Sequence, residues 1–256
     1  FVGARSRSVS DHASHCRIEL IQMTHAIPKP DAHQPLREAL RDMCKSFDSK
    51  YWQEVDEARG YPEAFVKTLT EAGWLAALIP TEYGGSGLGL AEASVIMEEI
   101  NLSGGNAGSC HGQMYNMGTL LRHGSDLQKQ TYLPKIASGQ LRLQSMAVTE
   151  PTTGTDTTQL KTTAVRKNDR YVVNGQKVWI SRIQHSDLMI LLARTTPLSE
   201  VKKKSEGMSI FMVDLKQAIG HGMTVKPIRN MVNHETNEVF FDNLEIPVEN
   251  LIGEEG

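Results

Sequence analysis

Cysteine is scarce in this sequence, and its few cysteines are far apart. They are Cys16, Cys44 and Cys110, in a chain of 256 residues. An odd number of widely spaced cysteines offers neither a disulfide framework nor the paired Cys-x-x-Cys arrangement of a metal or redox site. We therefore expect reduced thiols in an intracellular protein, and we expect no metal site.

Long hydrophobic runs and an excess of one charge are also missing. No apolar run approaches the ~20 residues that a membrane-spanning helix requires. The 27 Lys and Arg residues nearly balance the 30 Asp and Glu residues, which leaves a net charge of -3 and no basic excess for nucleic acid. The content of hydrophobic residues, 39%, is that of a globular protein with one large or two modest domains. We expect neither a membrane nor a nucleic-acid partner.

Residues 1–30 differ in composition from the rest of the chain. Arg5 and Arg7 alternate with serines, and no acidic residue precedes Asp11, which is typical of a mitochondrial transit segment. The chain does not begin with Met, and Met23 is an internal alternative start, so these residues are equally compatible with upstream translation. We interpret residues 1–30 as an irregular N-terminal segment outside the fold.

Apolar residues recur at the helical period between residues 31 and 138. Residues 36–47 carry apolar side chains at i, i+3, i+4, i+7, i+8 and i+11, which is one stripe of an α-helix. A second stripe begins after Pro62 and ends at Gly73, two residues that favour a helix start and a helix end. The pattern predicts an all-α domain over residues 31–138. Its later helices are expected at residues 90–102, 110–123 and 126–138.

The period changes near Gly139. Residues 164–180 contain short β-branched runs separated by Asn-Asp and Asn-Gly pairs, which predicts antiparallel hairpins. We therefore expect an antiparallel β domain, a small barrel or sandwich, over residues 139–256. The fold class is thus α+β multidomain, helical first and β second. Further strands are expected at residues 188–193, 208–213, 223–225 and 239–241.

Two predicted strands end in polar motifs that could meet. Residues 146–156 (MAVTEPTTGTD) end one strand in hydroxyls, a proline and a glycine, and residues 177–181 (KVWIS) end another in a tryptophan and a hydroxyl. An isoalloxazine ring is apolar on its faces and has hydrogen-bonding atoms along its edge, so it requires an apolar wall together with small donors. The two motifs supply complementary halves of such a site.

Each residue of these motifs also has a structural interpretation. A tryptophan in a strand, such as Trp179, is usually a core aromatic, and Thr149 and Ser181 are ordinary strand-end hydroxyls. Asp156 most simply forms an Asx turn. The residues alone therefore leave both interpretations open.

Several motifs together resemble the acyl-CoA dehydrogenase family, from about Leu36 to Gly256. Two positions depart from the family pattern, because Thr153 and Gln159 occupy places where the family usually has small residues. These departures weaken the assignment to a subfamily more than the assignment of a cofactor. The motifs occur in the family's order and spacing, at residues 73–87, 128–139, 149–151 and 174–181.

The resemblance implies a three-domain protein of which this chain covers two. The family's third, helical C-terminal domain supplies the catalytic glutamate, and this chain stops at Gly256, about where the middle domain gives way to the third. We therefore expect no catalytic residue here. The implied reaction is FAD-dependent α,β-dehydrogenation of an acyl-CoA, with electrons passed to an electron-transfer flavoprotein. The complete protein is expected to be a homo-oligomer, either tetramer or dimer, in the cytoplasm of a bacterium or the mitochondrial matrix of a eukaryote.

The resemblance also assigns roles by position. The pyrimidine edge of the flavin is assigned to Thr149 and the backbone near Val148, the N5 side to Ser181 and one face to Trp179. Glu150 receives a structural role. Substrate binding is assigned to Thr155 and, in the segment before Gly207, to Ser205. The full set of cofactor residues is Met146, Val148, Thr149, Gly154, Thr155, Trp179, Ile180 and Ser181.

Two other functions stay open. The chain could be a non-catalytic fragment that binds flavin or acyl-CoA, or a flavin monooxygenase or oxidase of the same fold. On the main interpretation too, the chain as given is expected to bind flavin weakly and to turn over acyl-CoA poorly or not at all, because a site without its third domain is open to water. The monooxygenase or oxidase predicts oxygen consumption.

Overall fold

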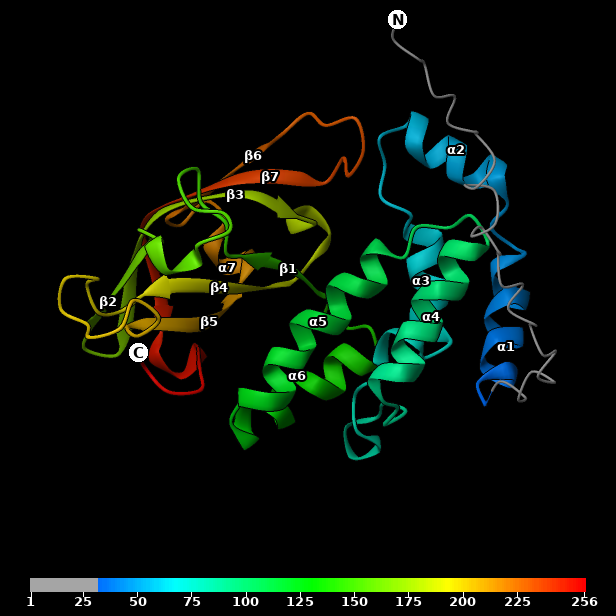
Figure 1. Ribbon diagram of the computed structural model, residues 1–256, viewed down its shortest axis with the longest axis horizontal. Helices are drawn as coiled ribbons and strands as arrows, with labels where there is room; N and C mark the ends of the chain where they lie inside the picture. Colours follow the sequence, from blue (N-terminus) through cyan, green and yellow to red (C-terminus); the bar gives the residue numbers. More distant parts are fainter. Residues whose placement is uncertain (1–31) are drawn as a thin grey trace, which may run out of the picture. The chain divides into compact units, whose positions relative to one another are not determined.

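The computed structural model describes residues 32–256, and residues 35–256 form one compact unit. The predictions for residues 1–30, Cys16 included, therefore lie outside the described residues. The first part of the unit is helical and the second is a β-sheet, as the sequence predicts (Figure 1). The helices of the first part are α1 (Gln34–Cys44), α2 (Ser49–Glu57), α3 (Glu63–Glu71), α4 (Leu90–Leu102), α5 (Gly108–His123) and α6 (Asp126–Ala137).

Local capping interactions fix where these helices begin and end. The Asp48 carboxylate accepts from the backbone amide of Tyr51 at the start of α2. Ser125 and Gln128 form a reciprocal capping box at the start of α6. After α3, Gly73 adopts a left-handed backbone with φ of 78°, which stops the helix where the sequence predicts.

The second part of the unit is a single eight-stranded sheet. Its path is β6-β7-β3-β2-β4-β5-β8, and β1 pairs with β4 beside this path. Most pairs are antiparallel, but β1 and β2 both run parallel to β4. The strands are β1 (Leu143–Ala147), β2 (Thr163–Lys167), β3 (Arg170–Ser181), β4 (Leu188–Arg194), β5 (Met208–Asp214), β6 (Met223–Pro227), β7 (Thr236–Pro247) and β8 (Leu251–Ile252), with the short helix α7 (Leu215–Ala218) after β5.

The sequence predicts a small barrel or sandwich, and the β domain is an open sheet, not a closed barrel. The edge strand β8 consists of two residues, which pair with Phe211 and Ile210 of β5, and it does not pair with β6 at the other edge. The sheet nevertheless bends. The rings of Tyr171 in β3 and Phe211 in β5 lie 4.8 Å apart, although β2 and β4 separate these strands in the sheet order. In a flat sheet three strand spacings would put them about 14 Å apart.

Helix α5 joins the helical part to the sheet. It packs so closely on β1 that a Cβ atom at Gly112 would lie 3.2 Å from the carbonyl oxygen of Gln144. Around this contact one apolar cluster combines residues of both parts, and Figure 1 shows α5 beside the β1 end of the sheet. The cluster contains Ala76, Ile79, Met117, Leu120, Leu133 and Ile136 from the helical part and Leu143, Leu188, Ile190, Met212 and Ile252 from the sheet.

Within residues 32–256, no helix is both long enough and apolar enough to cross a membrane.

Candidate functional site

The two motifs predicted from the sequence lie next to each other where β1 and β3 approach. The backbone amide of Val178 donates to the carbonyl oxygen of Thr149 at 2.9 Å, although β1 and β3 are not ladder partners. Thr149 and Ser181 are both half-buried, so their hydroxyls lie at the boundary between core and solvent. The backbone therefore joins the two strand ends directly.

Trp179 has a backbone conformation that tryptophan rarely adopts. Its φ is 64° and its side chain is 59% exposed. The ladder between β3 and β7 explains the geometry, because Lys177 pairs with Val239 and Ile180 with Asn237, which leaves one extra residue in β3. A left-handed bulky residue costs free energy, and such strain concentrates at functional sites. The bulge presents a large aromatic side chain to solvent instead of the core.

A buried ion pair stands behind this junction. The Lys177 ammonium donates to Glu150 Oε1 at 2.9 Å and to the carbonyl oxygen of Val148 at 2.9 Å. The two side chains are 0% and 4% exposed. Glu150 also accepts from the backbone amides of Lys161 at 2.7 Å and Thr162 at 2.9 Å. The pair thus ties the end of β1, the segment before β2 and the middle of β3 together.

The hydrogen bonds that Glu150 accepts affect its pKa more than its burial does. Burial alone would raise the pKa of this carboxyl, but the amides of Lys161 and Thr162, together with Lys177, hold its pKa below the ordinary range. Burial lowers the pKa of Lys177, against the opposing effect of Glu150. At neutral pH Glu150 is therefore an ionised carboxylate with no free role as a proton acceptor. The structural role expected for it agrees with these contacts.

The segment after Glu150 turns sharply and exposes its backbone. Glu150 and Thr153 exchange backbone hydrogen bonds of 2.9 and 3.1 Å, which closes a tight turn around Pro151. A Cβ atom at Gly154 would meet nothing within 4 Å. Gly154 and the next residue, Thr155, are exposed, so a bulky anionic group has room to approach this backbone.

Asp156 forms a local turn, which the sequence also favours. Its carboxylate accepts from the backbone amide of Thr158 at 3.2 Å and from the hydroxyl of the same residue at 2.5 Å. This turn leads into the short 3-10 helix η3 (Thr157–Gln159). Asp156 therefore shapes the loop that carries Thr155.

A buried arginine connects that loop to the one that carries Ser205. Arg194 lies at the end of β4 and is 4% exposed. Its guanidinium donates to the carbonyl oxygens of Thr158 at 2.8 Å, Glu206 at 2.9 Å and Lys204 at 3.2 Å. Ser205 itself is exposed. The two segments assigned to the substrate are thus held to a common anchor.

The remaining assigned residues contact their surroundings in other ways. Ile180 is 2% exposed and lies in the core of the β domain, so its side chain is not available to a ring. Met146 packs on the apolar cluster between α5 and the sheet. Val148 offers its carbonyl oxygen to Lys177. The assignments of Ile180 and Val148 to a flavin therefore rest on their backbones, and they remain predictions.

Sequence reasoning missed Lys177 and Arg194. Lys177 lies inside the apolar strand β3, and Arg194 is the last residue of the apolar strand β4. Long cationic side chains at such positions usually extend to solvent. The sequence offers one indirect indication of Lys177. If Glu150 in the first motif is buried, it requires a buried cation as its partner. Among residues 32–256, the structure contains no cluster of three His, Cys, Asp or Glu side chains that could hold a metal ion.

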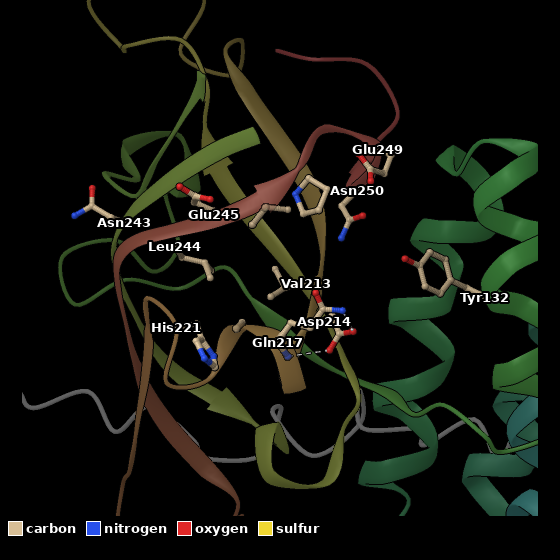
Figure 2. A pocket seen from close by; sticks show the side chains of 13 residues that line it. Tyr132, Val213, Asp214, Gln217, His221, Asn243, Leu244, Glu245, Glu249 and Asn250 are labelled. Carbon is tan, nitrogen blue, oxygen red and sulfur yellow. Dashed lines mark hydrogen bonds between the residues drawn. The ribbon is translucent and has the colours of Figure 1, made fainter. Parts of the chain in front are cut away.

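A cavity of about 540 Å³ lies elsewhere, and Figure 2 shows its lining. Tyr132 of α6 faces it from one side, and Asp214, Gln217 and His221 approach from the other, around α7. Several carboxylates line this cavity and none of the residues assigned to the flavin does. It is a poor match to a flavin, whose faces require an apolar wall.

The junction of β1 and β3 fits a flavin better. It combines an exposed aromatic face on a strained bulge, two half-buried hydroxyls at adjacent strand ends and an uncrowded glycine turn. These features match the apolar faces, the polar edge and the pyrophosphate of a flavin dinucleotide. The donor set that the structure brings together is therefore chemically compatible with FAD.

Two family models match the chain. The acyl-CoA dehydrogenase N-terminal domain matches residues 30–140, and the acyl-CoA dehydrogenase middle domain matches residues 145–244. A curated relative, acyl-CoA dehydrogenase FadE26 of Mycobacterium tuberculosis, is 37% identical over 88% of this chain and 58% of its own length. Mitochondrial isovaleryl-CoA dehydrogenase of Pongo abelii is 32% identical over 88% of this chain and 53% of its own.

Solved structures agree with these matches. An acyl-CoA dehydrogenase from Geobacillus kaustophilus superposes with a TM-score of 0.77 at 30% identity, over 87% of this chain and 58% of that one. A glutaryl-coenzyme A dehydrogenase in complex with glutaryl-CoA gives a TM-score of 0.79 at 28% identity, over 87% and 56%. The chain thus spans little more than half the length of these proteins. On the two domain matches and the shared fold, it belongs to the acyl-CoA dehydrogenase family.

Proposed function

We propose that this chain carries the FAD-binding and acyl-CoA-binding part of an enzyme that dehydrogenates acyl-CoA thioesters between the α and β carbons. The observation that supports this most is the junction of β1 and β3. There a strained and exposed Trp179 lies beside the backbone bond that links Val178 to Thr149. The membership in the acyl-CoA dehydrogenase family supplies the reaction class.

Different residues of the junction would bind different parts of a flavin. Thr149 and the backbone at Val148 would bind the polar edge, Ser181 would donate beside the ring, and Trp179 would cover a face. A bound FAD would supply the acceptor for the hydride that leaves the β carbon. Because Lys177 donates to the Val148 carbonyl oxygen, the backbone at Val148 and Thr149 is fixed in place, and preorganised dipoles favour the charge that develops during reaction.

The substrate would lie toward the two loops joined by Arg194. Thr155 and Ser205 are exposed hydroxyls on these loops, and Lys202, Lys203 and Lys204 add positive charge there. Hydroxyls and ammonium groups suit the phosphates of a coenzyme A tail. We infer that these loops bind the coenzyme A part of the thioester.

The base that removes the α-proton is proposed to lie outside these 256 residues. Glu150 is the only carboxylate within the two flavin motifs that is buried, and Lys177 and two backbone amides already occupy it. Its lowered pKa makes it a weak base. Electron transfer to a flavoprotein partner is likewise a proposal, supported by a neighbour at 29% identity and a TM-score of 0.76 that is described as an electron-transferring flavoprotein of Acidaminococcus fermentans.

The homo-oligomeric state and the cellular location remain proposals too. Relatives described as mitochondrial occur in animals and plants, whereas others come from bacteria. A mitochondrial matrix or a bacterial cytoplasm therefore suits this chain, according to its source.

Flavin binding is the decisive test. The chain is mixed with excess FAD, the unbound flavin is removed, and the absorbance of the retained flavin is measured. We expect weak but measurable binding. Thr149→Val and Ser181→Ala should each weaken it by about 2- to 10-fold, the effect of one lost hydrogen bond. Thr152→Val, at an exposed threonine of the same turn, should leave it unchanged. Equal affinity in all variants would refute the site.

Two further measurements separate the alternatives. Anaerobic addition of acyl-CoA bleaches the flavin of a dehydrogenase or an oxidase, and leaves that of a pure binding fragment coloured. Oxygen consumption after reduction distinguishes an oxidase or a monooxygenase from a dehydrogenase. Loss of a general base typically reduces the rate about 10²–10⁴-fold, so we expect slow bleaching at most.

A further inference from the structure

The residue that follows β3, Arg182, is unusual in two respects. Its backbone is left-handed, with φ of 63°, and it caps the short 3-10 helix η4 (Ile183–His185). Its guanidinium makes no hydrogen bond and no ion pair with residues 32–256, and its Nε is fully buried without a partner. A partly buried cation without a counter-charge is costly, so native proteins rarely keep one without a reason.

Two glycines of α5 make room for this guanidinium. A Cβ atom at Gly108 would overlap Arg182 Nη2, and one at Gly112 would lie 3.3 Å from Nη1. Residues four apart lie on the same face of a helix, so the two glycines form one flat cradle. Glycine destabilises a helix interior by about 1 kcal/mol relative to alanine. Here the absence of a side chain leaves space for the guanidinium.

The surroundings increase the unbalanced charge. Gly108 is the first residue of α5, whose amino-terminal turn carries no acidic residue, and the helix dipole is positive at that end. Arg182 acts electrostatically on Tyr115 and His185, and Glu235 is its neighbour across the strands, because the Arg182 amide donates to the Glu235 carbonyl oxygen at 2.9 Å. Burial raises the pKa of Tyr115, which Arg182 opposes, and burial lowers the pKa of His185, so both are neutral at pH 7. No carboxylate of residues 32–256 lies within ion-pair distance of the guanidinium.

The cradle borders an open face beside the flavin residues. His111 and Tyr115 follow Gly108 at helical spacing on the same face of α5, both are exposed, and their rings lie 4.9 Å apart. Arg182 immediately follows Ser181, which the proposed function places next to the flavin ring. If Ser181 holds the flavin as proposed, the guanidinium lies next to the flavin site, where the acyl part of a bound thioester would extend.

We propose that Arg182 is a specificity-determining residue that binds a carboxylate carried by the acyl group of the substrate. A guanidinium is a planar fork of donors that matches a carboxylate in two parallel hydrogen bonds, and the carboxylate would neutralise the charge that the protein leaves unpaired. The proposal rests on the proposed function. It deepens that function by naming the substrate class, which is a half-thioester of a dicarboxylic acid.

The test compares acyl groups of equal carbon number. Glutaryl-CoA and pentanoyl-CoA both have five acyl carbons, and adipyl-CoA and hexanoyl-CoA both have six, but only the first of each pair carries a carboxylate. Binding of each thioester to the FAD-loaded chain is measured by titration calorimetry. We expect at least one acidic thioester to bind about tenfold or more tightly than its neutral counterpart, as a charge-assisted hydrogen-bonded pair implies.

Variants locate the effect. Arg182→Gln should abolish the preference, and Arg182→Lys should retain part of it because the charge remains without the fork. Gly108→Ala keeps the charge but displaces the guanidinium, and it should also reduce the preference, while the flexible side chains around it let the fold persist. Arg122→Gln, at an exposed arginine of the same helix, is the matched control and should change nothing.

The outcomes are separable from those of the proposed function. Retained FAD with equal affinity for acidic and neutral thioesters would overturn the role of Arg182 and leave the flavin site standing. A preference that survives Arg182→Gln, or no binding of any thioester, would overturn it as well. Loss of FAD binding in the unmodified chain would instead refute the flavin site. A preference that weakens with added salt and disappears in Arg182→Gln is the expected result.

Discussion

A buried glutamate occurs in each half of the molecule, and the two are neutralised differently. Glu99 in α4 is 1% exposed and binds Arg37 and Arg41 of α1, whose side chains are 17% and 49% exposed. Glu150 pairs with Lys177, which is 0% exposed. The helical pair keeps its cations in contact with water, whereas the pair in the sheet is dry on both sides.

This difference separates two uses of charge. Arg41 contacts Glu99 through Nε at 2.6 Å and Nη2 at 2.9 Å, which joins two helices near the surface, and either arginine can compensate for loss of the other. Lys177 has no substitute among residues 32–256 for its bonds to Val148 and Glu150. In the sheet one cation, Lys177, neutralises the buried glutamate, whereas in the helices two arginines share that role.

The largest expected effect is from breaking the dry pair. Lys177→Met leaves Glu150 charged and unpaired, and we expect a loss of about 3–5 kcal/mol in the free energy of unfolding. Urea unfolding followed by circular dichroism measures it. The double variant with Glu150→Gln should be less destabilised than Lys177→Met alone. A loss below about 1 kcal/mol would mean that water reaches Glu150 and that the pair is not dry.

A smaller effect is expected in the helices. Glu99→Gln removes the acceptor of two arginines but leaves both cations in reach of solvent, so the expected loss is about 1–3 kcal/mol. Arg37→Gln should cost less, because Arg41 still neutralises the carboxylate. Unfolding in urea is again the measurement. If Glu99→Gln lowered the free energy of unfolding as much as Lys177→Met, the solvent exposure of the cations would not explain the difference between the two glutamates.

A pH dependence is expected where the two halves meet. His185 of η4 stacks on Tyr61 of the helical half, with ring centroids 4.2 Å apart. Burial lowers the pKa of His185 from its ordinary 6.5, against the opposing charges of Glu235 and Glu63. As the pH falls below about 6.5, the unfolded chain takes up a proton that the folded chain refuses, so stability decreases.

His185→Phe keeps the ring and removes the titration. We expect its free energy of unfolding to fall less than that of the unmodified chain between pH 7 and pH 5. Unfolding midpoints across this range measure the slope. Parallel curves for the two chains would show that His185 takes up its proton equally in both states.

The smallest effect is expected at the bulge, and with the opposite sign. Trp179→Asn replaces a strained left-handed tryptophan by a residue that tolerates positive φ, and it removes a side chain that is mostly exposed. The chain should become more stable by up to about 1 kcal/mol while its affinity for FAD falls. Thermal unfolding and flavin retention are measured together. Destabilisation with unchanged flavin retention would assign Trp179 a structural role.

The sequence predicted the helices and the order of the two halves well. Apolar periodicity predicted α1, α3 and α4, and Asn168-Asp169 forms the predicted turn between β2 and β3. The hairpin predicted at Asn174-Gly175 is wrong, because this pair lies inside β3 at a register shift against β7, and α2 was not predicted. These signals are local, so they survive without knowledge of the tertiary structure. The open sheet was not predictable in this way, because closure depends on whether the edge strands β6 and β8 pair, and these strands are distant in the sequence.

The motifs of the candidate site could be predicted from the sequence, but the buried or unpaired cations around it could not. Thr149 and Trp179 were found from strand ends and from the family resemblance. Lys177 was missed because lysine is a surface residue by composition, and only the buried Glu150 requires it inside. Arg182 was missed because its importance depends on two glycines some 70 positions earlier in α5. Contacts between distant segments leave no local pattern.

The apolar cluster between α5 and the sheet has a consequence for how such a protein can be divided. Ile252, the last residue of β8, is buried in the same cluster as Leu120 of α5 and Leu133 of α6. The boundary between the two family models, near residue 140, therefore runs through a continuous core. A chain cut near residue 140 would therefore expose apolar side chains on both pieces, so we expect the two halves to fold as one unit.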